Sequence, residues 1–334
     1  MRAIALEGGQ VALQTDRRNA TPRDGEVLVR VIRAGVCETD LQLIRGYMNF
    51  RGVLGHEFVG IAEEGPYAGR RVVCEINCNC QTCDTCLAGR PTHCPNRTTI
   101  GIANHDGAFA DYIAVPQHNL HLVPDSMPTD VAVFTEPVAA AFQIPAQIPV
   151  HRADRIVVLG DGRLGNLCAQ VLAGIADHVL VVGKHPDKLA LLDDLGLEIA
   201  HLDDVRAVAG QPPSKMADVV VDCTGSETGL PTALQLVRPR GTVVLKTTVA
   251  GTQQMPWAPI VIDEVSVVGS RCGPFDRALE ALEAGSVSVL PMISGRFVLA
   301  SGLDALEAAQ RRGALKVLID VATHEEAGRT GQAG

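Results

Sequence analysis

Hydrophobic and polar positions follow one pattern in the first part of the chain and another in the rest. Up to about residue 125, short segments with alternating apolar and polar residues, such as residues 26–32 (EVLVRVI), are separated by turns containing glycine and proline. This alternation is typical of β-strands, and several short strands at this spacing predict a small, irregular β-barrel. Residues 131–142 are apolar and predict a connecting helix.

From residue 155 onward, short apolar strands alternate with helical segments. Residues 156–159 and 179–182 are unbroken apolar runs, as expected of strands that are buried on both faces of a sheet. Residues 164–173 and 186–195 have the pattern of helices. This alternation of strand and helix predicts an α/β fold with a doubly wound parallel sheet.

Length and charge restrict the classes of function. A chain of 334 residues is long enough for two domains. The 29 lysines and arginines against 38 aspartates and glutamates give a net charge of −9, without a basic cluster, which argues against a nucleic-acid partner. Residues 1–9 lack the apolar core of a signal peptide, and no apolar run reaches the roughly 18 residues of a membrane span. We therefore expect a cytoplasmic protein without a membrane partner.

Six of the ten cysteines fall between residues 74 and 95, and their spacing indicates a metal lobe. In a chain without a secretory signal, clustered Cys-x-x-Cys pairs indicate metal binding before disulfides. Four thiolates satisfy tetrahedral zinc and leave no position open for a substrate, so the predicted role is structural. The predicted ligands are Cys80, Cys83, Cys86 and Cys94, and Cys78 is an alternative to Cys80.

A glycine-rich turn follows the predicted strand 156–159 and opens the next helix. In this context the pattern G-x-G-x-x-G is typical of dinucleotide binding, with the pyrophosphate at the helix N-terminus. The residues predicted to bind the cofactor in this turn are Gly160, Gly162, Arg163, Leu164 and Gly165.

The end of the next strand bears on the choice of cofactor. NAD-binding sheets usually carry an aspartate or glutamate there for the ribose hydroxyls, whereas this chain has Gly183, Lys184 and His185. We therefore predict NADP in preference to NAD, although Lys184 as an ordinary loop lysine would leave both cofactors open. Thr224, after a later strand, is expected near the nicotinamide ring.

A third group of candidate ligands is dispersed along the chain: Cys37, the pair His56 and Glu57, and Glu136. A cysteine, a histidine and a carboxylate can supply three zinc ligands and leave the fourth position for water or an alcohol. Each residue also has an ordinary interpretation, since a buried cysteine or histidine is common in a core.

The motifs in this order, with residues 35–40 (GVCETD), 55–57 (GHE) and 135–137 (TEP), resemble the zinc-dependent medium-chain alcohol and polyol dehydrogenases, and are similar to the sorbitol and threonine dehydrogenase branch. The resemblance covers nearly the whole chain. It implies a GroES-like, partly open β-barrel catalytic domain of residues 1–137 and 276–334. It also implies a Rossmann domain of residues 138–275, with the active site between the two.

The resemblance also assigns roles to individual residues. Cys37 and His56 would bind a catalytic zinc with Glu136 as third ligand, and Glu57 can exchange into the coordination sphere in similar enzymes. Thr39 would accept the proton of the alcohol. With the cysteine lobe, the resemblance implies two zinc ions per chain.

The implied activity is hydride transfer between an alcohol or polyol, or its carbonyl product, and NADP or NAD. The implied assembly is a homodimer or homotetramer. Gln42 stands where related enzymes have a histidine of the proton relay, so the proton must leave by water or by another group. The alternatives are a zinc-free, quinone-reductase-like enzyme and a non-catalytic nucleotide-binding protein of the same fold.

Overall fold

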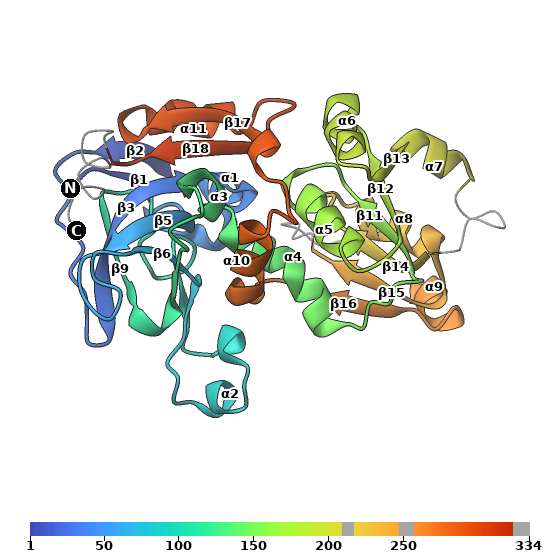
Figure 1. Cartoon of the computed structure of the whole chain (residues 1–334), viewed down its shortest axis with the longest axis horizontal. Helices are drawn as coiled ribbons and strands as arrows, with labels where there is room; N and C mark the ends of the chain where they lie inside the picture. The colour runs from blue at the N-terminus through green and yellow to red at the C-terminus, as the bar shows by residue number, and fades with distance from the viewer. Residues whose placement is uncertain (209–216, 247–256, 323–334) are drawn as a thin grey trace. The chain divides into compact units, whose positions relative to one another are not determined.

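The computed structural model describes residues 1–208, 217–246 and 257–322, and the chain divides into two units (Figure 1). The first unit comprises Met1–Glu136 together with the chain from Val289 onward, and the second comprises Pro137–Ser288. Residues 323–334, which the sequence assigns to the first domain, lie outside the described residues. No helix among the described residues has both the length and the apolar character needed to cross a membrane.

The first unit is built on a twisted sheet with one long central strand. Buried and partly exposed residues alternate along most of this strand, so the apolar face of the 26–32 segment lies in the core. In sheet order the strands are β10 (Leu120–Leu122), β6 (Arg71–Cys74), β5 (Glu57–Ala62), β3 (Glu26–Gly35), β18 (Lys316–Asp320) and β17 (Ile293–Val298), and β9 (Tyr112–Pro116) also pairs with β3.

Smaller sheets and short helices complete the first unit. The smaller sheets are β2 (Gln10–Gln14), β1 (Ala3–Glu7) and β4 (Gly52–Val53), and the pair β7 (Asn77–Cys78) and β8 (Thr98–Thr99). The α-helices are α1 (Glu38–Ile44), α2 (Asp84–Leu87), α3 (Thr129–Ala132) and α11 (Gly302–Ala308), and α4 (Thr135–Gln147) runs from the first unit into the second. The 3₁₀ turns are Tyr47–Asn49, Pro91–His93, Gln117–Asn119, Leu290–Met292 and Leu299–Ser301.

The second unit is a six-stranded parallel sheet whose strands alternate with helices. The strand order is β13-β12-β11-β14-β15-β16, which is the doubly wound order of the Rossmann fold. Its strands are β11 (Arg155–Leu159), β12 (His178–Gly183), β13 (Glu198–His201), β14 (Ala217–Asp222), β15 (Val237–Leu245) and β16 (Ser266–Gly269). Its helices are α5 (Arg163–Ala173), α6 (Pro186–Asp194), α7 (Leu202–Val208), α8 (Gly229–Leu236), α9 (Trp257–Ile262) and α10 (Phe275–Glu283).

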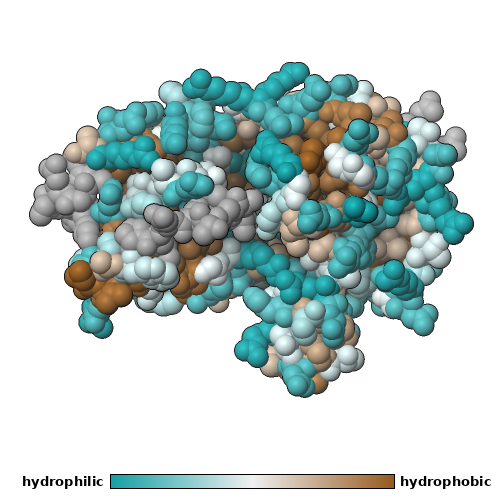
Figure 2. All heavy atoms as spheres, turned by 180° about the vertical axis from the view of Figure 1, so that it is seen from behind, coloured by the Kyte–Doolittle hydropathy of each residue, from teal (hydrophilic) through white to brown (hydrophobic). Residues whose placement is uncertain are grey.

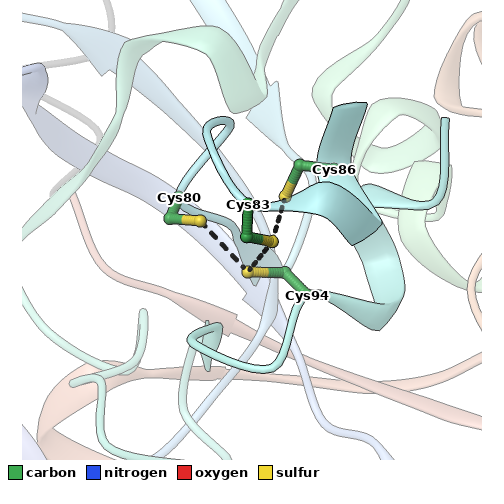
Figure 3. A group of neighbouring side chains, drawn as sticks. All are labelled: Cys80, Cys83, Cys86 and Cys94. Carbon is green, nitrogen blue, oxygen red and sulfur yellow. Dashed lines mark hydrogen bonds between the residues drawn. The ribbon is translucent and has the colours of Figure 1, made fainter. Parts of the chain in front are cut away.

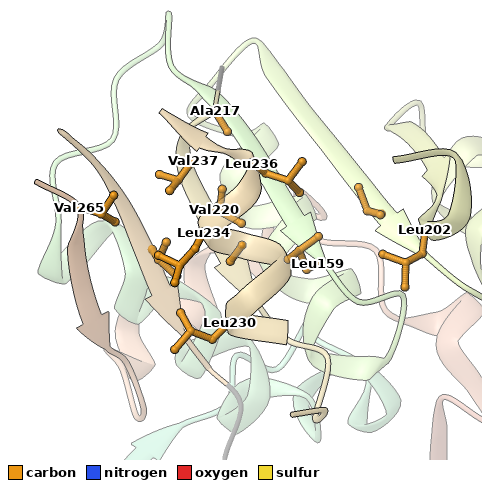
Figure 4. Packing of buried hydrophobic residues seen from close by; sticks show 12 residues of the cluster. Leu159, Leu202, Ala217, Val220, Leu230, Leu234, Leu236, Val237 and Val265 are labelled. Atoms are coloured by element: carbon orange, nitrogen blue, oxygen red, sulfur yellow. The ribbon is translucent and has the colours of Figure 1, made fainter. Parts of the chain in front are cut away.

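The core of this sheet is aliphatic, as the low aromatic content requires. Leu159 and Val220 from two adjacent strands pack with Leu234 of α8 (Figure 4). Val182 of β12 and Val243 of β15 belong to the same buried cluster. The parallel pairing sets Leu159 opposite both Val182 and Asp222. The carboxyl ends of β11, β12 and β14 therefore lie side by side at one edge of the sheet.

The second unit continues to Ser288, whereas the sequence places the boundary at residue 275. Gly273 lies against α4, where a Cβ would be 1.9 Å from the carbonyl oxygen of Ala139. The side chain of Gln170 in α5 donates to the carbonyl oxygen of Ser288 at 3.0 Å and accepts from its amide at 2.6 Å. These contacts hold α10 and the residues after it to the Rossmann sheet.

Replacing Gly165 by alanine is expected to destabilise this unit, because its Cβ would lie 1.9 Å from the carbonyl oxygen of Gly160. Relieving such an overlap by shifting a helix from its strand costs about 1–3 kcal/mol. We expect a lower melting temperature by circular dichroism. Gly162→Ala is the matched control, because nothing lies within 4 Å of the Cβ position at residue 162. Equal melting temperatures for the two variants would contradict this interpretation of the turn.

Candidate functional site

The four predicted cysteine ligands come together in the lobe around α2 (Figure 3). The sulfur of Cys83 lies 3.5 Å from that of Cys86 and 3.7 Å from that of Cys94, and the sulfur of Cys94 lies 3.5 Å from that of Cys80. Sulfurs at the corners of a zinc tetrahedron are about 3.8 Å apart. The spacing of the quartet therefore fits a single zinc ion.

The lobe favours the thiolate form of one of the four cysteines, Cys80, whereas burial and the neighbouring sulfurs raise the pKa of Cys86 to about 12. Backbone amides of Thr82 and Cys83 lower the pKa of Cys80 to about 5, so its sulfur is ionised at neutral pH. Cys78, the alternative ligand, is buried in β7, and burial raises its pKa to about 12. The sulfurs that lie close together are those of Cys80, Cys83, Cys86 and Cys94, so Cys80, and not Cys78, is the member of the quartet.

A second group of residues that could bind a metal lies where two paired strands, β3 and β5, end and begin. The donor atoms of Cys37, His56 and Glu57 all lie within 4.8 Å of one another. Cys37 follows β3 and caps the N-terminus of α1, and Glu57 begins β5. Antiparallel pairing sets Gly35 opposite Glu57, which brings these distant segments to one place.

A buried carboxylate that the sequence pattern did not single out, Asp40, supports this group. It accepts hydrogen bonds from the amides of Cys37 at 2.8 Å and Gly55 at 3.1 Å. Its Oδ1 also lies 3.4 Å from Nδ1 of His56, which is too long for a strong bond, and Nδ1 has no hydrogen-bond partner among the described residues. Metal-ligating histidines commonly face a carboxylate in this way through the ring nitrogen that does not bind the metal. The arrangement leaves Nε2 of His56 for a metal.

Burial and the neighbouring groups shift the pKa of His56 in opposite directions. Burial lowers the pKa of the imidazole, but the carboxylate of Asp40 and the sulfur of Cys37 outweigh it and hold the pKa well above its usual value. A buried imidazole between a carboxylate and a sulfur is in an environment suited to a cation. The donor set, one thiolate, one imidazole and a nearby carboxylate, is that of an open zinc site.

Glu57 is bound by a second residue that the sequence pattern did not single out, Lys316 in β18. The two form an ion pair, and their side chains are 1% and 2% exposed. The Lys316 ammonium also lies 5.6 Å from the centre of the Phe134 ring, a cation–π contact. Gly35 makes room for the pair, since a Cβ there would lie 2.6 Å from Oε2 of Glu57. The only sequence signal was a lysine directly before the apolar residues 317–319.

Glu136, the third ligand implied by the resemblance, is not in the group of donor atoms found among the described residues. It lies in the first turn of α4, two residues after Phe134. Because Phe134 packs under Lys316, the start of α4 lies beside the Glu57–Lys316 pair.

Two other residues of α1 bear on proton transfer. Oγ1 of Thr39 lies 3.7 Å from the sulfur of Cys37, so its hydroxyl is at the metal-ligand group. Gln42 donates to Oε1 of Glu38 at 3.0 Å on the exposed side of the helix. Thr39 is therefore placed to contact a ligand at this group, and Gln42 is held by its neighbour.

The predicted cofactor residues gather at the carboxyl ends of β11, β12 and β14. Gly160 turns the chain with a φ of +115°, and Gly162 caps α5 with open space around it. Arg163 and Leu164 form the first turn of α5. A pocket of about 150 Å³ opens here and is lined by residues that include Gly160, Asp161, Gly183, Lys184, His185, Arg206, Thr224 and Thr228.

This edge of the sheet carries a carboxylate that the sequence pattern did not reveal, Asp161 in the glycine-rich turn. Its Oδ2 accepts hydrogen bonds from the amides of Lys184 and His185, both at 2.7 Å, and its Oδ1 lies 2.9 Å from Nδ1 of His185. Burial raises the pKa of Asp161, but together these hydrogen bonds lower it by more, so the pKa lies below its usual value. Asp161 is therefore ionised at neutral pH.

Each of the two units matches the sequence model of a known domain family. Residues 23–125 match the model of the alcohol dehydrogenase GroES-like domain, and residues 163–285 match that of the zinc-binding dehydrogenases. A sorbitol dehydrogenase of Halalkalibacterium halodurans is 28% identical over 330 residues, covering 93% of this chain and 96% of the relative. An L-threonine 3-dehydrogenase of Saccharopolyspora erythraea is 27% identical over 342 residues, covering 96% and 99%.

Solved structures agree with the fold and with a nucleotide site. A zinc-binding dehydrogenase from Sinorhizobium meliloti, solved with NADP, has a TM-score of 0.86 and 28% identity, covering 96% of this chain and 99% of that one. An alcohol dehydrogenase from Escherichia coli, solved with NADH, has a TM-score of 0.88 and 25% identity over the same shares. The predicted combination of a GroES-like barrel and a Rossmann domain is confirmed. The chain belongs to the zinc-dependent medium-chain alcohol and polyol dehydrogenases, a family of oxidoreductases.

Proposed function

We propose that this chain interconverts an alcohol or polyol and its carbonyl product, with a nicotinamide dinucleotide as hydride acceptor or donor and with zinc at the Cys37 and His56 group. The observation that carries the proposal is the group formed by half-buried Cys37 and buried His56 and Glu57, whose donor atoms lie within 4.8 Å of one another. A zinc-dependent alcohol dehydrogenase needs an open metal site together with a dinucleotide turn, and the same chain contains candidates for both. The zinc-free alternative leaves the buried cluster unexplained.

We propose Glu136 as the third ligand of this zinc. The carboxylate of Glu57 is already neutralised by Lys316, and a zinc ion bound there would sit close to a buried ammonium. The contact between Lys316 and Phe134 brings the start of α4, which carries Glu136, to the same region. A thiolate and a carboxylate then balance the charge of Zn²⁺.

Each residue of the group has a distinct role in the proposed reaction. Zinc, when bound, supplies Lewis acidity, which makes an alcohol hydroxyl easier to deprotonate and a carbonyl easier to reduce. Thr39 takes up the proton of the substrate hydroxyl at Oγ1, which lies beside Cys37, and in the same step passes its own hydroxyl proton to water. Asp40 holds the Cys37 amide and faces the His56 ring, which fixes the orientation of both ligands.

We propose that the cysteine quartet holds a second, structural zinc ion. Its four sulfurs complete a tetrahedron and leave no position for a substrate. The lobe around α2 contains only short elements, so a metal would supply much of the energy that keeps it folded.

We propose a homodimer or homotetramer that forms through the second unit. β16 is at the edge of the Rossmann sheet and has one open side among the described strands. The adjacent segment exposes Trp257, Val261 and Ile262, which are 66%, 71% and 77% accessible. Hydrophobic residues are visible on the surface in Figure 2. An open strand edge next to apolar side chains is typical of a surface that another chain covers.

Substituting one cysteine in each metal group should separate the two zinc ions. We expect about two zinc ions per chain in the wild type and about one in Cys37→Ser, which keeps its fold but loses activity, because only an open site is lost. Cys83→Ser should lose the other ion and melt at a lower temperature, because metal binding contributes to folding. Elemental analysis and circular dichroism measure both effects. Full zinc content in Cys37→Ser would refute the catalytic site.

Substitutions at the two carboxylates should identify the third ligand. We expect Glu136→Gln to lose catalytic zinc while the lobe keeps its ion. Glu57→Gln is combined with Lys316→Met, because removing one partner of a buried ion pair alone costs about 3–5 kcal/mol. The double variant should keep both zinc ions. Loss of zinc from the double variant, and not from Glu136→Gln, would assign the third position to Glu57.

Asp40→Asn is expected to weaken zinc binding at the catalytic group by about 10- to 100-fold, the usual effect of losing the carboxylate behind a metal-ligating histidine. Competition with a chelator measures this affinity on the folded protein. Glu38→Gln, an exposed change on the same helix, is the control and should leave the affinity unchanged. Equal affinities in the two variants would show that Asp40 does not position the ligands.

A further inference from the structure

The carboxylate of Asp161 occupies the position in which a dinucleotide-binding sheet usually presents its ribose-binding acid. That acid normally extends from the end of the second strand, which here is Gly183 of β12. A Cβ built on Gly183 would lie 2.4 Å from Oδ2 of Asp161 and 2.7 Å from its Cγ. The glycine-rich turn therefore supplies the carboxylate that the strand end lacks.

The hydrogen bonds of Asp161 determine what this position can accept. Its Oδ2 binds the amides of Lys184 and His185, so neither of these backbone donors is available to a phosphate. Among the described residues, its Oδ1 has one hydrogen-bond partner, the ring of His185, and keeps the capacity to accept another hydrogen bond. A ribose hydroxyl can donate that bond, whereas a 2′-phosphate, which is an acceptor with negative charge, cannot.

The electrostatic potential in the pocket depends on how far each charged group around it is buried. The Asp161 side chain is 7% exposed and lines the pocket, so solvent screens its charge weakly. Lys184 and Arg206 are exposed to solvent, and the His185 ring faces Asp161 itself. The cations therefore contribute less to the pocket than the buried carboxylate does.

We propose that Asp161 makes this enzyme select NAD(H) over NADP(H), by accepting a hydrogen bond from the adenosine ribose and repelling a 2′-phosphate. The proposal rests on the proposed function. It reverses the preference for NADP that Gly183, Lys184 and His185 predict from the sequence. Asp161 also explains why residue 183 is a glycine, because no side chain fits at residue 183 while the carboxylate is there.

Direct binding of NADH and NADPH to the full-length zinc-loaded protein, by nucleotide fluorescence, tests the selection without turnover. We expect the wild type to bind NADH more tightly by at least about tenfold, and Asp161→Asn to shift the ratio of the two affinities toward NADPH by about 10- to 100-fold, the effect of removing one close charge. Asp187→Asn, an exposed neighbour in the first turn of α6, is the control and should leave the ratio unchanged.

Relocating the carboxylate is a second, independent measurement. Asp161→Gly should shift the ratio toward NADPH, and adding Gly183→Asp to it should restore NADH preference, because the space that Asp161 fills is then open to the new side chain. Circular dichroism confirms that each variant is folded. A wild type that prefers NADPH, or a ratio that none of the Asp161 variants changes, would overturn the proposal. A folded wild type that binds neither nucleotide would instead overturn the proposed function.

Discussion

The pairing of β3 with β5 is the constraint on which the candidate metal centre depends. Its register sets Gly35 opposite Glu57, so Cys37 beyond the end of one strand meets His56 before the start of the other. A shift of one residue would exchange the faces of His56 and Glu57, because side chains alternate along a strand. The ligand geometry is therefore a consequence of the barrel's hydrogen-bond register, and Asp40 fixes it further by bonding the amides of Cys37 and Gly55 on both segments.

Tight packing around two glycines restricts the backbone at both sites. Gly55, which precedes His56, has a φ of +94°, and a Cβ there would overlap the ring of Phe109 at 2.4 Å. In the second unit, the backbone of Gly165 lies against the carbonyl group of Gly160 in the same way. Only glycine permits such approaches. The side chains next to these glycines are held by packed backbone rather than by flexible loops.

Local signals in the sequence predicted the parts of the fold whose causes are local. The apolar runs at residues 156–159 and 179–182 are buried strands of the Rossmann sheet, and the cysteine quartet is a single loop whose spacers limit its geometry. Asp161 was missed because the pattern Gly-Asp-Gly fixes the turn but not the direction of the side chain, whose partners Lys184 and His185 lie more than 20 residues away.

The ion pair between Lys316 and Glu57 could not be predicted from the sequence for a related reason. A lysine next to the apolar residues 317–319 of β18 indicates that some partner exists, but the partner, Glu57, is 259 positions away in the chain. Only the arrangement in which β18 and β5 flank the same strand, β3, brings the two together. Interactions of this kind follow from topology, and a periodicity argument cannot supply the topology of a barrel with many short strands.

Three buried carboxylates share one physical principle, and their partners explain their different roles. Glu57 is paired with an ammonium, so its charge is cancelled and it contributes mainly to structure. Asp40 and Asp161 each face a histidine ring and accept hydrogen bonds from two backbone amides, so the direction of each carboxylate is fixed. A buried carboxylate in a fixed direction affects what binds beside it. For Asp40 this is a metal ion at the metal-ligand group, and for Asp161 it is the nucleotide in the pocket. The same device thus favours a cation at the metal-ligand group and disfavours an additional phosphate in the nucleotide pocket.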